Sequence, residues 1–395
     1  MTGVKIPYDQ TAFGLAVQPG IYFGMSAEEY HAIPALSNSG VKQILCSPMN
    51  FWANTLWLNP EYEEEESRFM DMGKAYHSRI VEGRDAFYSR YAPALDPDDY
   101  PDALKTMEDL RSALPEGVKK GGNKTELAAR VLDHFPHAEI WDLMIEEYEN
   151  QHEGKEFLSQ NLIKKIEIAA AMIEKHPQLC KAFTGGYPEV SIVWNCRETG
   201  VPMKARLDYL KTRAIVDLKT FSNPFNKPVD RAIAYAVASY KLHIQVAVYH
   251  EAVEEAKAML QAAANTGGID AMKATIHGDF DPAWIGQFAN CGFMKPIPPR
   301  DPNEMLDDEE LDDLPSESYR GGHEFLFVFQ QTGVAPVARG WKFPRHLTYD
   351  IGKIAVAEAK RLFKENMERF GKDPWIDQTG IQEFDDSAFP AFITE

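Results

Sequence analysis

The chain has 395 residues, of which 44% are hydrophobic and 26% are charged, and its mean hydropathy is −0.37. These values are typical of a soluble globular protein with a substantial core. The sequence contains no apolar run near the ~18 residues that a membrane span needs, and it does not open on a basic segment followed by a hydrophobic one. We therefore expect a cytoplasmic protein with no membrane partner.

The four cysteines, at positions 46, 180, 196 and 291, are far apart and form no Cys-x-x-Cys pair. This spacing excludes a zinc knuckle and a typical iron–sulfur site. So few cysteines in so long a chain also argue against a disulfide framework. We expect reduced thiols.

The net charge is −19, which argues against a nucleic-acid partner, because phosphate binding needs clustered lysine and arginine. However, much of the acidic excess is concentrated in residues 61–66 and 301–317. Local patches decide binding more than the sum of charges does. The composition therefore leaves a nucleic-acid partner open.

Residues 1–20 lack a clear period and are interpreted as a leader. Ser26 with Glu29 forms a capping-box pattern, and Ser37 caps a second predicted helix. An aromatic-rich helix follows Pro48, and residues 69–83 are predicted as a helix that ends at a glycine. His77 lies in that helix, and its role depends on where the helix docks.

Residues 84–165 are polar, are interrupted by proline and glycine, and are interpreted as a helical insertion. Two short helices around a basic loop resemble a SAP-type DNA-binding module. The alternative is a helical spacer. On the SAP-like hypothesis the phosphate contacts are Lys119, Lys120, Lys124 and Arg130.

A helix over 162–174 and a strand over 188–195 lead into a predicted hairpin at residues 203–220. Strand-like residues flank the polar pair Lys211-Thr212, which predicts a very short loop. If residues 210 and 213 close the loop, Asp208 lies opposite Ile215. Asp217 is then a diagonal neighbour of Asp208, with Cβ atoms roughly 7 Å apart.

Period-two alternation places Asp208, Asp217 and Lys219 on one face of this hairpin and apolar residues on the other. Two like charges this close repel unless a positive group lies between them. A hard divalent ion with oxygen ligands, Mg²⁺, meets that need, and Lys219 can hold a water beside it. The alternative is an ordinary surface ion pair between Lys219 and an aspartate.

The second half of the chain is predicted to contain helices and strands in alternation. On the longer helix, Gln245 and Tyr249 form an i, i+4 pair that projects from one side, for which helix packing is the alternative reading. Residues 296–322 are interpreted as an acidic loop with no assigned role. The predicted elements are helices at 229–239 and 240–261, a strand at 274–277, a hairpin of 323–330 with 337–343, and a helix at 349–370.

A histidine on an early helix, an aspartate in one strand, Asp-x-Lys in the next and Gln-x-x-x-Tyr on the following helix occur in that order. This order resembles the PD-(D/E)XK nuclease superfamily, in particular its RecB-like branch and the RecE-type exodeoxyribonucleases of phage and prophage recombination systems. The segments that carry the resemblance are Leu36-Ser-Asn-Ser-Gly, Met72-Gly-Lys-Ala-Tyr-His77, Lys204-Ala-Arg-Leu-Asp208-Tyr, Ile215-Val-Asp217-Leu-Lys219-Thr and Gln245-Val-Ala-Val-Tyr249.

The resemblance implies an α/β (α+β) fold with a restriction-endonuclease-like core, a central mixed sheet flanked by helices, and a helical insertion. The core would comprise residues 21–83 and 166–295, completed by residues 323–395. Asp208, Asp217, the backbone carbonyl of Leu218 and His77 would hold Mg²⁺, with Mn²⁺ as a substitute. Lys219 would position water, Gln245 and Tyr249 would place the substrate strand or support Lys219, and Lys204 and Arg206 would contact the DNA backbone.

The implied function is a Mg²⁺-dependent exodeoxyribonuclease that degrades linear duplex DNA from the 5′ end and leaves 3′ single strands. Such an enzyme would act in the cytoplasm of a bacterial or phage-infected cell, as a homo-oligomer such as a ring tetramer, beside a single-strand annealing protein. The alternatives are a single-strand-specific or helicase-associated RecB-like nuclease, and a non-catalytic DNA-binding or assembly module.

Overall fold

The computed structural model describes residues 17–62, 68–291, 323–333, 335–343, 347–377 and 380–381. The acidic loop at 296–322 and nearly all of the predicted leader lie outside these residues. The chain divides into two compact units. Unit 1 comprises Met1–Glu66, Lys181–Phe329 and Arg339–Glu395, and unit 2 comprises Ser67–Cys180 and Gln330–Ala338. The predicted insertion, residues 84–165, falls inside unit 2.

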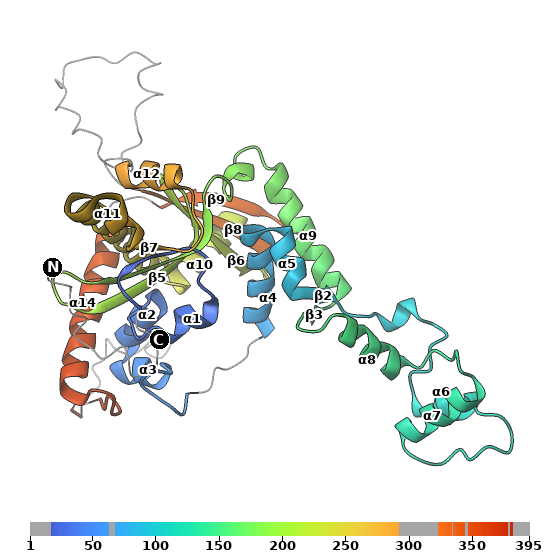
Figure 1. The fold of residues 1–395 in the computed structure, drawn as a ribbon. Helices are drawn as coiled ribbons and strands as arrows, with labels where there is room; N and C mark the ends of the chain where they lie inside the picture. Colours follow the sequence, from blue (N-terminus) through green and yellow to red (C-terminus); the bar gives the residue numbers. More distant parts are fainter. Residues whose placement is uncertain are drawn as a thin grey trace, which may run out of the picture. The chain divides into compact units, whose positions relative to one another are not determined.

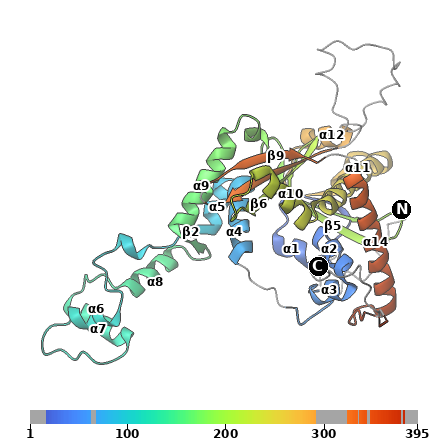
Figure 2. The same ribbon diagram turned by 180° about the vertical axis from the view of Figure 1, so that it is seen from behind.

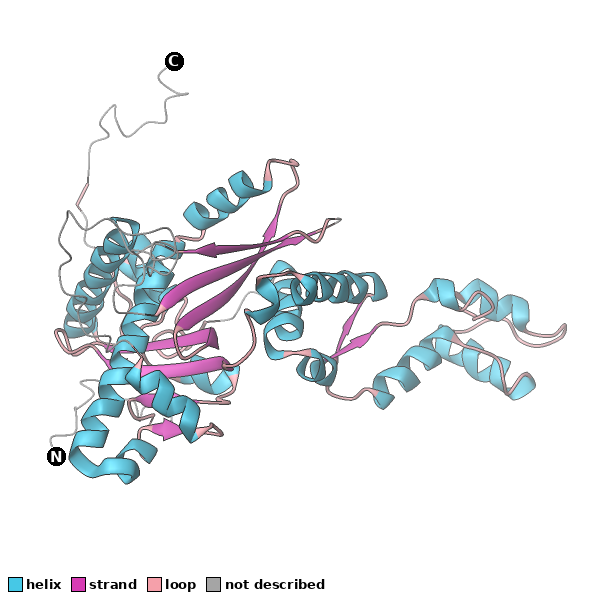
Figure 3. Ribbon diagram, turned by 90° about the horizontal axis from the view of Figure 1, so that it is seen from above, coloured by secondary structure: helices cyan, strands magenta, loops and turns pink. Residues whose placement is uncertain are grey.

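A mixed sheet lies among the helices of unit 1 (Figure 3). It has seven strands in the order β7-β1-β4-β5-β6-β8-β9. Strand β1 pairs parallel with β7, whereas β1–β4, β4–β5 and β5–β6 are antiparallel. The sheet confirms the predicted fold class and the antiparallel run of three strands that carries the acids. The strands are β1 Gly20–Tyr22, β4 Tyr187–Asn195, β5 Pro202–Leu210, β6 Ala214–Ser222, β7 Ile276–His277, β8 Glu324–Thr332 and β9 Ala338–Lys342.

The N-terminal helices of unit 1 begin where the sequence places their caps. The Ser26 side chain accepts a hydrogen bond from the Glu29 amide, and the Glu29 carboxylate accepts one from the Ser26 amide. These two bonds complete the predicted capping box. Ser37 caps the next helix by accepting from the Gly40 amide. The helices of unit 1 are α1 Ala27–Ala32, α2 Asn38–Cys46, α3 Pro48–Ala53, α10 Val229–Ser239, α11 Leu242–Lys273, α12 Pro282–Asn290 and α14 Leu347–Phe370 (Figure 1).

Helix α11 is the main covering element of the sheet. It contacts β1, β4, β5 and β7, and helices α2 and α14 pack on it in turn. The core between them includes fully buried Trp194, Phe325 and Phe363. Helix α11 runs through Gly267 and Gly268 to Lys273, beyond the end predicted at residue 261. Glycine in a helix interior costs only about 1 kcal/mol, which packing offsets.

The β5–β6 hairpin has the predicted two-residue loop, but the loop is shifted by one residue. The amide of Lys211 donates to the carbonyl of Ala214, and Leu210 pairs with Ile215. Thr212 and Arg213 therefore form the loop, in place of the predicted Lys211-Thr212. In consequence, Ile215 lies opposite Leu210 and not opposite Asp208.

Unit 2 consists of short helices around two small cores. One core holds Tyr76, Phe87 and Ile166, and the other holds Leu110 and Leu127. The helix predicted to end at a glycine does so through a final π-helical turn at Ser78–Glu82 before Gly83, whose φ is 101°. The elements are α4 Arg68–His77, α5 Arg84–Arg90, β2 Tyr91–Pro93, a 3₁₀ turn Pro97–Asp99, α6 Met107–Ala113, α7 Lys124–His134, α8 Trp141–Gln151, β3 Glu156–Leu158 and α9 Gln160–Lys175.

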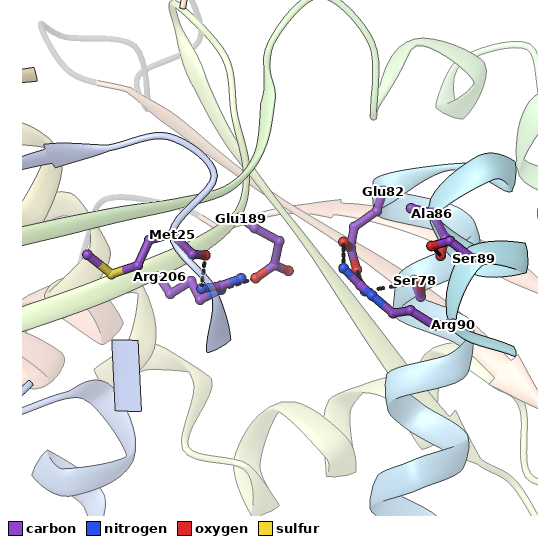
Figure 4. Close-up of polar contacts among 8 residues, drawn as sticks. All are labelled: Met25, Ser78, Glu82, Ala86, Ser89, Arg90, Glu189 and Arg206. Atoms are coloured by element: carbon purple, nitrogen blue, oxygen red, sulfur yellow. Dashed lines mark hydrogen bonds and ion pairs between the residues drawn. The ribbon is translucent and has the colours of Figure 1, made fainter. Parts of the chain in front are cut away.

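Several charged residues of unit 2 form opposite-charge pairs. Arg79 is 8% exposed and bridges Glu167 of α9, at 2.9 Å, and Glu174, at 3.2 Å. Tyr88 also donates to Glu167, at 2.9 Å. Arg90 pairs in the same way with Glu82 and donates to Ser78 (Figure 4). Among the described residues, none of the helices is long and apolar enough to cross a lipid bilayer.

Candidate active site

Three carboxylates form a row across the three central strands of the sheet. Pro188 pairs with Tyr209 and Val190 with Leu207, so Glu189 of β4 falls across from Asp208 of β5. Tyr209 also pairs with Val216, so Asp217 of β6 falls across from Asp208 on its other side. The two aspartates are therefore direct neighbours, closer than the diagonal placement that the sequence predicted.

Glu189 has an unusual backbone and a cationic neighbour. Its φ is 53°, a left-handed conformation that costs a non-glycine residue roughly 1 kcal/mol or more and that is enriched at active sites. Its carboxylate forms an ion pair with Arg206, which also donates to the carbonyl of Met25 at 2.8 Å (Figure 4). An oxygen of Glu189 lies within 4.8 Å of an oxygen of Asp208.

Asp208 is held by the backbone of the neighbouring strand. Its Oδ2 accepts a hydrogen bond from the Leu218 amide at 2.9 Å. Strand β5 pairs with β6 at Tyr209–Val216 and Leu210–Ile215. The Asp208 carboxylate thus accepts from the amide of Leu218, the residue after Asp217. This hydrogen bond fixes the Asp208 carboxylate against β6, the strand that carries Asp217.

Asp217 is fully buried and has two side-chain partners from the predicted motif. Gln245 of α11 donates from Nε2 to Asp217 Oδ2 at 2.5 Å, and Lys219 forms an ion pair with Oδ1. Burial by itself would lower the pKa of Lys219, but the charges of Asp217 and Asp208 outweigh it and raise that pKa. Lys219 is therefore a fixed cation in this site at neutral pH.

Tyr249 lies one turn beyond Gln245 on α11 and is 8% exposed. Burial and the negative charges of Asp217 and Asp208 raise the pKa of its phenol well above the usual range. The phenol therefore keeps its proton and remains a hydrogen-bond donor. The i, i+4 pair that the sequence identified faces the acids, as the motif requires.

A cavity of about 600 Å³ opens beside Lys219, Gln245 and Tyr249. Two further lysines line it, Lys42 from α2 and Lys241 from the start of α11. Burial is the main reason that the pKa of Lys42 is lowered to about 8. The charges of Lys219 and Lys241 also lower this pKa, and the charge of Asp217 opposes them. The cavity thus brings three amino groups to one side of the acidic row, a charge pattern that suits an anionic substrate.

Two further predicted residues are His77 and Lys204. His77 is the last residue of α4, in unit 2. Lys204 is 5% exposed, and its ammonium donates to the carbonyls of Tyr30, His31 and Ile33 at 2.8–3.1 Å. Burial lowers the pKa of Lys204 to about 7, yet three acceptors match the three protons of an ammonium. Lys204 therefore holds the end of α1, and its prediction as a DNA contact is corrected.

The basic residues predicted in the insertion divide into two groups. Arg130 donates to the carbonyls of Lys119 and Gly121 at 2.9 and 2.7 Å, so it holds the loop in place. Lys124 pairs with Asp142 at 2.7 Å. Only Lys119 and Lys120 of this group of four are exposed. Arg130 and Lys124 thus have internal partners that compete with any phosphate contact.

Three residues of the site were missed from the sequence: Glu189, Lys42 and Lys241. Glu189 could have been found from the strand register, because the chain turns back between Cys196 and Val201 and counting outward from that turn places it across from Asp208. Lys42 carries no such signal, since only the packing of α2 brings it to the cavity.

The residues of the row fit a hard divalent cation. Directly opposed like charges destabilise a sheet, so three carboxylates in adjacent register positions are costly unless positive charge offsets them. Arg206 and Lys219 offset part of this charge from the two ends. Carboxylate oxygens are the ligands that Mg²⁺ prefers. The three carboxylates of the row therefore suit a hard divalent cation.

Comparison with curated proteins finds no match for the chain. Among solved structures, it is similar to the crystal structure of a protein from Eubacterium rectale described as a "Putative exonuclease", with 15% identity and a TM-score of 0.39 over 89% of this chain and 88% of that one. A likeness this distant carries no argument about function. A family model matches residues 37–262, which include Glu189, both aspartates, Lys219, Gln245 and Tyr249. The chain belongs to the family described as PDDEXK-like domain of unknown function (DUF3799).

Proposed function

We propose that the chain is a Mg²⁺-dependent nuclease that hydrolyses phosphodiester bonds of DNA. The observation that carries the proposal is the placement of Asp217 directly across from Asp208, with Lys219 paired to Asp217 and the cationic cavity beside it. A purely structural cluster would pair acids with bases, as Arg79 does in unit 2. Acids that face acids require a further cation to act as a stable unit.

In this proposal Asp208 and Asp217 hold the metal, together with the backbone carbonyl of Leu218. The structure adds Glu189, and the family resemblance adds His77 as a further ligand. A bound Mg²⁺ would supply a water of lowered pKa and charge stabilisation at the phosphate. The left-handed backbone of Glu189 aims its carboxylate at the row at a cost in stability, which fits a position selected for function.

The remaining residues orient the reactants. Lys219 is fixed by Asp217, so its ammonium can hold the attacking water and stabilise negative charge that develops on the phosphate. Gln245 fixes the Asp217 carboxylate through its 2.5 Å hydrogen bond. The protonated phenol of Tyr249 can donate to a phosphate oxygen. Water adds to phosphorus, one P–O bond breaks, and the leaving oxygen ends as a hydroxyl.

The finer proposal follows the RecE-type resemblance. It assigns linear duplex DNA as the substrate, 5′-to-3′ degradation that leaves 3′ single strands, a ring-shaped homo-oligomer and a single-strand annealing protein as partner. Lys42 and Lys241 support an anionic substrate, because they extend positive charge away from Lys219 in a chain whose net charge is −19.

The test is degradation of end-labelled linear duplex DNA with Mg²⁺, compared between wild type, Asp217→Ala and Lys219→Ala. We expect both variants to lose cleavage and to keep the circular dichroism of the folded protein. Removal of Mg²⁺ with a chelator should abolish cleavage by wild type, and Mn²⁺ should restore it. Release of label from the 5′ end before the 3′ end would support the assigned direction.

The matched control is Glu358→Gln, which changes an exposed acid on α14 that pairs with Arg361. This variant should cleave like wild type. Unchanged cleavage in Asp217→Ala would contradict the proposed site. Equal cutting of circular and linear DNA would contradict the exonuclease assignment and leave the nuclease assignment intact.

A further inference from the structure

Exposed aromatic rings and cations gather on one face of unit 1, directly after the strand that carries Asp217 and Lys219. Phe225 is 80% exposed and Tyr235 is 50% exposed. The ammonium of Lys227 lies 4.4 Å from the Tyr235 ring centre and 5.8 Å from that of Phe225, and the Arg231 guanidinium lies 5.9 Å from the Tyr235 ring. We name these four residues the aromatic–basic face.

A built turn presents Phe225 to solvent. The Asn223 side chain accepts from the Lys227 amide at 3.0 Å and donates to the Lys227 carbonyl at 2.8 Å. Asn226 takes the left-handed conformation, with φ of 48°, which asparagine tolerates better than most residues. Prolines at 224 and 228 restrict the turn further. Phe225 is thus held outward by the backbone around it.

Helix α10 presents the second half of the face. Arg231 and Tyr235 lie one turn apart and both are exposed, whereas Ile233 and Ala236 on the other side of the helix are buried in the core. A hydrogen bond from Arg231 and the charges of Arg231 and Lys227 lower the pKa of Tyr235. The buried side anchors the helix, and the exposed side carries the rings and the cations.

The chain continues from this face into the cavity beside Lys219. Helix α10 ends at Ser239 (Figure 2). Ser239, Tyr240 and Lys241 line that cavity. Residues 221–243 carry three cations, Lys227, Arg231 and Lys241, against one acid, Asp230. In a chain with 60 acidic and 41 basic residues, this short segment has the opposite charge balance.

We propose that the aromatic–basic face binds single-stranded DNA and directs it to the cavity beside Lys219. This inference rests on the proposed function, which supplies DNA as the polymer. Phe225 and Tyr235 offer π-faces for unpaired bases, and Lys227 and Arg231 lie within reach of the phosphates between those bases. Paired bases within a duplex are stacked on their neighbours, so an exposed aromatic ring selects the unpaired strand.

Charge favours this partner over a second copy of the chain. Interfaces between copies are depleted in lysine at their cores, whereas this face sets Lys227 against both rings. A polyanion would be repelled by most of a chain with a net charge of −19 and would be attracted to a segment of opposite balance.

The experiment is fluorescence anisotropy of a labelled oligothymidylate with the full chain, in EDTA so that no metal supports cleavage. We expect the double variant Phe225→Leu/Tyr235→Leu to bind about tenfold or more weakly, because stacking is lost. The slope of log K against log salt should not change in this variant. The double variant Lys227→Ala/Arg231→Ala should reduce the magnitude of that slope by about 1.4, since each phosphate contact contributes about 0.7 on a single strand.

Ring-preserving variants, Phe225→Tyr and Tyr235→Phe, serve as matched controls and should bind like wild type. Wild-type affinity and salt slope in both double variants would overturn the inference. The inference would also be overturned, in favour of an interface between copies, if sedimentation velocity showed an oligomer for wild type and a dissociated chain for the ring variant. Hydrolysis of bis(4-nitrophenyl) phosphate with Mn²⁺ should be equal in wild type and all face variants, so a failure of the nuclease proposal would be visible separately.

Discussion

Two charged clusters among the described residues are built by opposite rules. In unit 2, Arg79 lies between Glu167 and Glu174, so a cation separates the two carboxylates. In unit 1, Asp208 lies between Glu189 and Asp217 across three strands, so carboxylates face carboxylates. The first arrangement lowers the energy of the folded chain by itself, whereas the second keeps the repulsion that Arg206 and Lys219 do not offset until a further cation is added.

This contrast separates residues that stabilise the fold from residues that act in the proposed reaction. Burial does not distinguish them, because Arg79 and Asp217 are both buried. The sign of the neighbouring charge does, and so does backbone strain, which occurs at Glu189 in the acidic row. We therefore expect substitutions in the unit 2 cluster to lower stability. Removal of a carboxylate from the acidic row should raise stability and abolish activity.

The largest expected effect is on activity, from Lys219→Met. Loss of the ammonium removes the charge beside the phosphate, and we expect the rate of DNA hydrolysis to fall roughly 10³-fold. Single-turnover cleavage at saturating DNA measures this loss apart from binding. A fall confined to apparent affinity, with an unchanged maximal rate, would show that Lys219 only attracts DNA.

The next effect is on stability, from Lys204→Met, in the strand that carries Asp208. The substitution leaves the carbonyls of Tyr30, His31 and Ile33 without their donor, and we expect the free energy of unfolding to fall by about 3 kcal/mol. Chemical denaturation measures it. Folded Lys204→Met should cleave DNA at the wild-type rate, in contrast to Lys219→Met; a loss of rate at full folding would return Lys204 to the site.

The comparison of these two lysines shows what the sequence could and could not predict. Lys219 was predicted because its partner Asp217 is two residues away and strand alternation places both on one side. Lys204 was misassigned because its acceptor, the carbonyl of Tyr30, lies 174 residues earlier in the chain. Helix caps such as Ser26 were predicted correctly for the same reason as Lys219, since cap and helix are local in sequence.

The hairpin shows a finer limit. Its two-residue loop was predicted, but a shift of one residue in the loop moved Asp217 from a diagonal position to one directly across from Asp208. Glu189 was missed although a strand over 188–195 was predicted, because its pairing and its left-handed backbone depend on how β4 and β5 meet. Residue types and their order are local properties, whereas the distances between them are set by the sheet.

A smaller effect, with the opposite sign, is expected from Asp208→Asn. The amide oxygen can still accept from the Leu218 amide, while one of three opposed charges is removed. We expect a gain in stability of about 1 kcal/mol without metal. Mg²⁺ should raise the melting temperature of wild type but not of the variant, because only wild type retains the complete site. Lower stability of metal-free Asp208→Asn would contradict the view that the row is strained.

The smallest effect is expected from Glu167→Gln in unit 2. Burial tends to raise the pKa of Glu167, but hydrogen bonds from Arg79 and Tyr88 outweigh it and hold that pKa below the usual 4.5. The carboxylate therefore stabilises the fold above pH 4.5, and this contribution is lost as the pH falls through the folded-state pKa. Because the pair is partly exposed and screened, we expect about 0.5–1 kcal/mol at pH 7.

Amide hydrogen exchange of peptides covering α9, Gln160–Lys175, measures this effect within the full chain. Protection, corrected for the intrinsic exchange rate, should be lower in Glu167→Gln than in wild type at pH 7, and the gap should close below pH 4.5. Mg²⁺ should leave the gap unchanged, whereas it should change the difference between wild type and Asp208→Asn. A gap that persists in acid would mean that Glu167 acts through packing and not through its charge, and the contrast between the two clusters would then rest on the acidic row alone.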